Sequence, residues 1–253
     1  MTHSVPSRSP RRAAARAAAL VLAAALALGL PACSSQPDTT TVFAAASLST
    51  VFPQIADEAK TPATFSFDGS SGLVDQLEGG APADVLATAD KTTMDRAVKG
   101  GLVETPREFA TNQLALVVPK GNPAGVTDLA DLDGKKLVIC APEVPCGRAT
   151  LQVAQDRSIT LKPVSEELKV TDVVGKVASG EADAGVAYTT DANDEVEVIT
   201  LPGADKRATH LYIARVKGTT KGSGADAFIA AVTGETGRRL LTAKGFGPAG
   251  AGV

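Results

Sequence analysis

Hydrophobic and polar positions follow two patterns that alternate along this chain. Short apolar runs, such as those at 41–45 and 137–140, predict buried strands, and apolar residues at helical spacing follow them. In the stretch 41–59, the strand is followed, after Ala46 and Ser47, by such a helical pattern. Strands that alternate with helices at this spacing predict parallel α/β sheets.

The same alternation continues to the C-terminus, where Gly, Pro, Asn and Asp mark the turns. Further strands are predicted at 64–67, 83–87, 114–118, 185–188, 196–201 and 211–216. Further helices are predicted at 73–78, 91–98, 128–132, 148–156, 173–179, 225–232 and 238–243. Asp90 and Thr127 precede two of these helices at positions where a side chain can cap the first turn.

The length of the chain allows one large domain or two lobes of about 100 residues each. The Pro/Gly cluster at 119–123 and the loop at 202–206 are the candidates for crossings between two lobes. These crossings would place residues 41–118 and 207–253 in lobe I and residues 119–206 in lobe II.

The first forty residues have a different character. A basic start with four arginines and no acid leads into an uncharged run of Ala and Leu that is too short to cross a bilayer comfortably. We therefore expect residues 1–32 to be a signal peptide. Leu30-Pro31-Ala32-Cys33 resembles a lipobox, which implies cleavage before Cys33 and lipid attachment to its thiol; ordinary signal cleavage nearby is the alternative. Residues 33–40 would then be a polar tether.

Charge narrows the class of partner. Removing residues 1–32 takes away four of the 25 basic residues and none of the 28 acidic ones, which leaves a net charge of −7. This balance argues against nucleic acid as a partner. It also means that a bound anion would have to be recognised by local groups.

Besides Cys33, the chain has two cysteines, Cys140 and Cys146. In an exported protein, a pair this close predicts a disulfide that closes a small Pro-rich loop, with a stabilisation of at most about 3 kcal/mol. A metal site is the weaker alternative, because no nearby His or further Cys completes a tetrahedron.

Four turns built from small or neutral residues precede predicted helices, at Ser47, 68–72, 144–147 and 170–172. A helix N-terminus presents free N–H groups and the positive end of a dipole, so it favours anions. In open α/β sheets such turns lie beyond the carboxyl ends of the strands, where ligands bind. The alternative for Ser47 is that it only caps its own helix.

Hydroxyls and amides are donors, so a fully deprotonated dianion suits such a lining. Monohydrogen phosphate carries a proton and would need a carboxylate acceptor, which Asp68 or Asp172 could supply. The chemistry therefore favours molybdate, tungstate or sulfate, with phosphate left open.

Three motifs, TVFAAASL at 41–48, GAPADVLATAD at 80–90 and GEADAGVAYTTDA at 180–192, resemble the molybdate-binding proteins that serve ABC importers. The similarity extends from Thr41 to about Phe246. It implies a two-lobed periplasmic-binding-protein fold of the second topological type. Each lobe would be a mostly parallel sheet flanked by helices, with a hinge between the lobes. It also implies that a tetrahedral oxyanion is held without a cation.

The ligand-binding residues that the resemblance implies are Ser47, Ser70, Cys146, Val170 and Tyr188. Ser47 and Ser70 would supply hydroxyls, with Ser71 as the alternative to Ser70. Cys146 and Val170 would supply backbone N–H groups, and Tyr188 its phenol. Cys146 departs from the alanine expected in the family.

The expected function is that of a monomeric extracytoplasmic lipoprotein. It would capture molybdate, and also tungstate, for a membrane permease, with no cofactor and no metal cation. Sulfate on the same fold is the nearest alternative. An enzyme is disfavoured because His210 is the only histidine after the signal peptide and no G-x-S-x-G motif occurs. A structural lipoprotein with an empty cleft is the third class.

Overall fold

The computed structural model describes residues 1–3 and 39–250. Cys33, the tether up to residue 38 and nearly all of the expected signal peptide lie outside the described residues. Within the described residues, no helix has the length and apolar character needed to cross a membrane.

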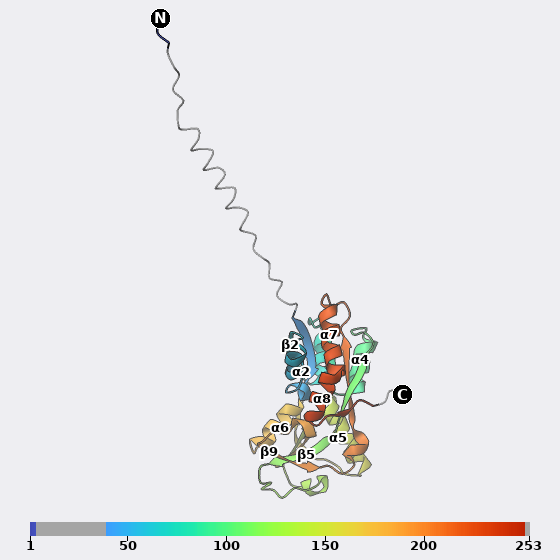
Figure 1. Cartoon of the computed structure of the whole chain (residues 1–253). Helices are drawn as coiled ribbons and strands as arrows, with labels where there is room; N and C mark the ends of the chain where they lie inside the picture. The colour runs from blue at the N-terminus through green and yellow to red at the C-terminus, as the bar shows by residue number, and fades with distance from the viewer. Residues whose placement is uncertain (4–38, 251–253) are drawn as a thin grey trace. The chain divides into compact units, whose positions relative to one another are not determined.

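Six strands form the first sheet, in the order β11-β4-β10-β3-β1-β2 (Figure 1). Their bounds are β1 Thr40–Ala45, β2 Ala63–Asp68, β3 Val85–Thr88, β4 Arg107–Asn112, β10 Thr209–Arg215 and β11 Gly247–Pro248. Side chains of β1 alternate between two cores, because successive residues of a strand point to opposite faces. Val42 and Ala44 belong to one core and Phe43 to the other.

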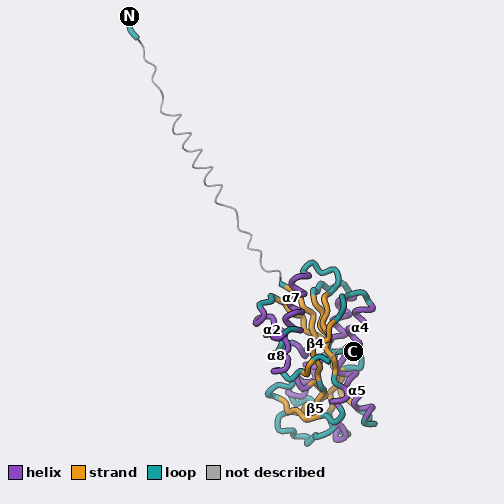
Figure 2. The backbone as a smooth tube through the Cα atoms, turned by 45° about the vertical axis from the view of Figure 1, so that its right-hand side comes forward, coloured by secondary structure: helices purple, strands orange, loops and turns teal. Residues whose placement is uncertain are grey.

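Helices cover both faces of this sheet (Figure 2). The Val42 face packs against α2 Phe52–Ala59, α7 Gly222–Thr233 and α8 Glu235–Ala243, and the Phe43 face packs against α3 Ser70–Glu78 and α4 Lys91–Lys99. We call this half of the molecule the first lobe.

Five strands form the second sheet, in the order β7-β6-β8-β5-β9. Their bounds are β5 Leu114–Pro119, β6 Leu137–Cys140, β7 Pro163–Glu167, β8 Ala184–Tyr188 and β9 Val196–Thr200. The helices that pack on this sheet are α5 Pro145–Asp156 and α6 Val170–Ala178. The second sheet and these helices form the second lobe.

The described residues also form short 3₁₀ turns. These are η1 Ala46–Leu48, which follows β1, and η2 Leu129–Leu132, η3 Thr189–Asp191 and η4 Ala204–Arg207.

Both sheets are mixed, whereas the resemblance implied mostly parallel sheets. Strands β2, β1 and β3 are parallel, as are β7, β6 and β8, but β4, β5, β9, β10 and β11 pair antiparallel. Leu114, at the start of β5, lies opposite Tyr188, at the end of β8. A strand that enters a sheet at the edge where the parallel strands end must run in the opposite direction.

The strand Leu114–Pro119 lies in the second sheet, although the sequence pattern placed it in lobe I. It follows β4 after one residue, Gln113, so the chain passes from one sheet to the other there. The expected crossing at 119–123 is a turn at the far end of β5. No Gly or Pro marks the change of sheet at Gln113, which is why the pattern missed it.

Most helix starts differ from the prediction, and that of α4 agrees. Helices α3, α6, α7 and α8 each begin three residues before the predicted starts at 73, 173, 225 and 238, and α2 begins at Phe52, after the separate turn η1. Asp90 caps α4 as predicted, with its carboxylate accepting a hydrogen bond from Thr93 N–H at 2.9 Å. Asp128 caps η2, whereas Thr127 was expected to. Helix α5 begins at Pro145 instead of at 148, because proline at the first turn leaves no N–H unpaired.

Candidate functional site

A small pocket lies between the two lobes, where turns that follow strands of both sheets meet. All five residues that the resemblance implied line it: Ser47, Ser70, Cys146, Val170 and Tyr188. The space open to the centre of a water-sized sphere is about 20 Å³. Because one water needs about 10–15 Å³ by this measure, the pocket suits a small, compact ligand.

Two hydroxyls in this pocket have no hydrogen-bond partner among the described residues. They are Ser47 Oγ and Tyr188 OH, on residues that are 5% and 1% exposed. Leaving a buried polar group unpaired costs about 1–3 kcal/mol, so such groups are rare without a reason. The expectation that Ser47 only caps its helix is wrong, since its hydroxyl accepts and donates no bond there.

Four helical starts meet at the pocket, as the four turns in the sequence predicted. The starts of η1, α3, α5 and α6 have no side-chain cap. The first backbone N–H groups of these helices therefore donate no hydrogen bond to a capping side chain. An anion in the pocket would meet donors and the positive ends of helix dipoles from both lobes.

The structure separates the two neighbouring serines. Ser70 Oγ lies in the pocket lining and accepts a hydrogen bond from Ala89 N–H at 3.0 Å, which orients the hydroxyl. Ser71 lies outside the lining, and its hydroxyl donates to the carbonyl oxygen of Glu143 at 2.6 Å. Gly69, in the predicted turn at 68–72, and Ala89, in the motif at 80–90, also line the pocket, although neither was predicted to bind the ligand.

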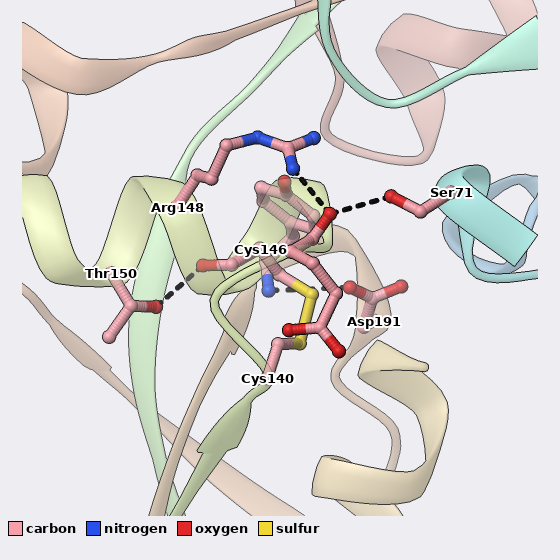
Figure 3. Close-up of a disulfide and its surroundings, with 8 residues drawn as sticks. Ser71, Cys140, Cys146, Arg148, Thr150 and Asp191 are labelled. Carbon is pink, nitrogen blue, oxygen red and sulfur yellow. Dashed lines mark hydrogen bonds between the residues drawn. A yellow bond between two sulfur atoms is a disulfide. The ribbon is translucent and has the colours of Figure 1, made fainter. Parts of the chain in front are cut away.

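A disulfide joins Cys140 at the end of β6 to Cys146 in the first turn of α5, with their Cα atoms 5.6 Å apart (Figure 3). The carbonyl of Cys146 accepts a hydrogen bond from Thr150 Oγ1 at 2.7 Å. A side chain on Gly147 would meet the carbonyl of Ala141 at 1.9 Å, so the loop packs closely on the helix start. The bridge and this contact hold the turn that places Cys146 in the pocket lining.

Free acceptors are scarce at this site. Asp68 lines the pocket, but its carboxylate accepts from Gly69 N–H at 2.8 Å and Gln76 Nε2 at 3.3 Å, and Lys169 Nζ lies 3.4 Å away. Asp172, the other acid considered, is not in the lining. Asp68 is thus partly engaged by protein donors, which makes it a poorer acceptor for a ligand that carries its own proton.

Burial raises the pKa of the Tyr188 phenol well above its usual value. The phenol therefore stays protonated and can donate a hydrogen bond to an anion. Asp191, three residues further on, accepts from Tyr188 N–H at 3.3 Å. Burial of its carboxyl raises the pKa of Asp191 to about 7.

A larger hollow, of about 470 Å³, lies on the first lobe around Asp84 and residues 217–221. The carboxylate of Asp84 there accepts from Thr41 N–H at 2.7 Å and from the Thr219 hydroxyl. Since these bonds already engage both carboxylate oxygens, size alone does not make this hollow a binding site.

The matching family model is that of the bacterial extracellular solute-binding proteins, and it covers residues 40–247. The chain belongs to this family. Among relatives of this solute-binding protein, the molybdate-binding protein ModA of Mycobacterium tuberculosis (strain ATCC 25618 / H37Rv) is 41% identical over 244 residues, which cover 87% of this chain and 94% of the relative. ModA of Escherichia coli (strain K12) is 32% identical over 200 residues, covering 70% and 77% respectively.

A solved structure supports the fold of this solute-binding protein. The periplasmic molybdate-binding protein of Azotobacter vinelandii matches with a TM-score of 0.71 and 20% identity, over 82% of this chain and 98% of the other. At this identity the likeness shows the fold alone. It confirms the two-lobed α/β fold class predicted from the sequence.

Proposed function

We propose that this protein captures molybdate, and also tungstate, outside the cytoplasm and delivers it to the membrane permease of an ABC importer. The observation that carries the proposal is the pair of buried, unpartnered hydroxyls of Ser47 and Tyr188, in one pocket with four uncapped helical starts. A donor-rich lining whose acid, Asp68, is already engaged by protein donors suits a fully deprotonated dianion. The ModA relatives support molybdate as that dianion.

The ligand contacts follow from the chemistry of each residue. Ser47, Ser70 and Tyr188 would donate through their hydroxyls, and Cys146 and Val170 through backbone N–H groups. Each donor to the dianion would be worth roughly 1.5–3 kcal/mol. No cofactor and no metal cation is needed, because the molybdenum enters as an oxyanion.

Capture would couple to closure of the two lobes. We infer that the hinge consists of Gln113 and the segment 201–208, which link the two sheets. A lipid on Cys33 would anchor the mature protein to the membrane as a monomer. Membership of the solute-binding family supports a role in transport.

The experiment is a calorimetric titration of residues 34–253 with molybdate, tungstate, sulfate and phosphate. We expect one-to-one binding of molybdate and tungstate, and far weaker binding of the other two. The Ser47→Ala variant should bind molybdate about 10- to 100-fold more weakly. Binding of sulfate alone would replace the ligand, and binding of none would refute the proposal.

A further inference from the structure

An ion pair crosses between the lobes beside the pocket. Arg148, on α5 of the second lobe, donates from Nε and Nη2 to Asp90 Oδ2 at 2.9 and 2.6 Å. Its Nη2 also lies 2.7 Å from Thr93 Oγ1. Asp90 and Thr93 belong to the start of α4 in the first lobe, so these bonds exist only while the lobes are together.

The same arginine is tied to a second cross-lobe contact. Arg148 Nη1 donates to the carbonyl oxygen of Glu143, in the loop closed by the disulfide. That oxygen also accepts from Ser71 Oγ of α3, in the first lobe, at 2.6 Å. Figure 3 shows Arg148 and Ser71 converging on this oxygen. The start of α5 is thereby fastened to both α3 and α4.

The Asp90–Arg148 pair should stabilise the contact between the lobes more than an ordinary surface ion pair would. The side chains of Arg148 and Asp90 are only 26% and 14% exposed. Asp90 is already held by its hydrogen bond from Thr93 N–H, so little side-chain entropy is lost when Arg148 binds it. Neither residue lines the ligand pocket, and their charges cancel, so the pair neither touches nor attracts an anion.

We propose that Asp90 and Arg148 form a cross-lobe fastening that sets how slowly the bound oxyanion is released. They are positioning residues, and the inference rests on the proposed function of the pocket. Breaking the fastening lowers the population of the closed form, from which the ligand cannot leave. Release therefore accelerates, whereas the rate of capture by the open form stays the same.

Asp90→Ser is the discriminating variant, because serine still caps α4 but removes the carboxylate that binds Arg148. The measurement is the release of radiolabelled molybdate from the mature protein after addition of excess unlabelled molybdate. Release should be about tenfold faster than in the wild type, with an unchanged association rate. Arg148→Met should give the same increase, and the double variant no further increase.

The matched control is Asp128→Ser, because serine can still cap η2. The variant removes the ion pair of Asp128 with Arg157 Nη2 at 2.7 Å, which lies within the second lobe and whose side chains are 25% and 24% exposed. Its release rate should equal that of the wild type. Unchanged release in Asp90→Ser, an equal increase in Asp128→Ser, or additive effects in the double variant would overturn the proposal.

A ligand-free measurement separates this proposal from the proposed function. If the wild type binds no oxyanion, the function fails, but the fastening can still be tested by amide hydrogen exchange of the ligand-free protein. Asp90→Ser should then accelerate exchange at the starts of α3 and α5, whereas Asp128→Ser should not. Equal exchange in both variants would overturn the fastening itself.

Discussion

Helix starts in this molecule are of two kinds. At α4 the Asp90 carboxylate takes the Thr93 N–H at 2.9 Å, so the start is satisfied within the protein. The starts of α3, α5 and α6, which border the pocket, have no side-chain cap. Starts away from the pocket, at α2, α7 and α8, lack a side-chain cap as well. The missing caps therefore leave donors open at the pocket, and it is the unpaired hydroxyls of the same pocket that point to a ligand.

The hydroxyls show the same contrast. Ser71 and Tyr212 donate to protein acceptors, whereas Ser47 and Tyr188 have none among the described residues. An unpaired buried hydroxyl destabilises the protein by about 1–3 kcal/mol, and a bound anion would offset this cost. The predictions below test whether these unpaired groups form hydrogen bonds with the ligand and how the surrounding structure supports them.

The largest effect should come from Gly69→Ala. A Cβ at Gly69, the residue before α3, would lie 2.2 Å from the carbonyl oxygen of Leu168 in the second lobe. The lobes could then not close over the pocket, and the affinity for molybdate should fall about 100-fold, in proportion to the lost closed population. Calorimetric titration measures this change.

Gly72→Ala is the control for this variant, because a Cβ there meets nothing nearer than Asp68 Oδ2 at 3.7 Å. Gly72 lies in the first turn of α3, three residues after Gly69, and its variant should bind molybdate as the wild type does. Equal affinities for the two variants would show that the approach of Gly69 to Leu168 is not needed for binding.

That contact also shows where prediction from the sequence stops. The apolar periodicity predicted most strands and helices, because burial of one face imposes the pattern. It missed β4 and β7, whose sequences REFATN and PVSEE have few apolar residues, β7 being at a sheet edge. The five pocket residues followed from motifs, but the approach of Gly69 to Leu168 joins segments far apart in sequence, which no local pattern encodes.

Tyr188→Phe should have the next largest effect. It removes one donor to the dianion, so the affinity for molybdate should fall about 10- to 100-fold. The free energy of unfolding without ligand should stay the same or rise, because an unpaired buried hydroxyl is lost. Titration and denaturant unfolding measure the two quantities.

The second tyrosine of the chain provides the control. Tyr212 donates to Glu108 Oε2 at 3.2 Å and lies outside the pocket lining. Tyr212→Phe should leave the affinity unchanged. A similar loss of affinity in both variants would mean that Tyr188 acts through the fold and not through the ligand.

Removal of the disulfide should have a smaller effect on binding. In the double variant Cys140→Ser and Cys146→Ser, the backbone N–H of residue 146 remains but loses its tie to β6. We expect the affinity for molybdate to fall only about fivefold, and the free energy of unfolding to fall by about 2 kcal/mol. Reductant should reproduce both changes in the wild type and change nothing in the variant. A loss of stability at unchanged affinity would limit the bridge to a stabilising role.

Asp191 should have the smallest effect on binding, since what it contributes is a pH dependence of the free energy of unfolding. The residue is partly exposed, but its carboxyl is enclosed, and burial raises its pKa from 3.8 to about 7. Between these two pH values the folded protein holds a proton on Asp191 that the unfolded chain has lost. The free energy of unfolding should therefore fall as the pH rises through this range.

Asp191→Asn removes this titration, so the stability of the variant relative to the wild type should be higher at pH 8 than at pH 5. Denaturant unfolding at the two pH values measures the difference, with the exposed Asp194→Asn as the control that should follow the wild type. If Asp191→Asn gave the same difference at both pH values, the carboxyl would not be titrating between them. A positive result would show that burial of the Asp191 carboxyl destabilises the folded protein at neutral pH, as burial of the unpaired Tyr188 hydroxyl does. The loss of stability that accompanies the binding site would then come from this neighbouring acid as well as from the unpaired donors.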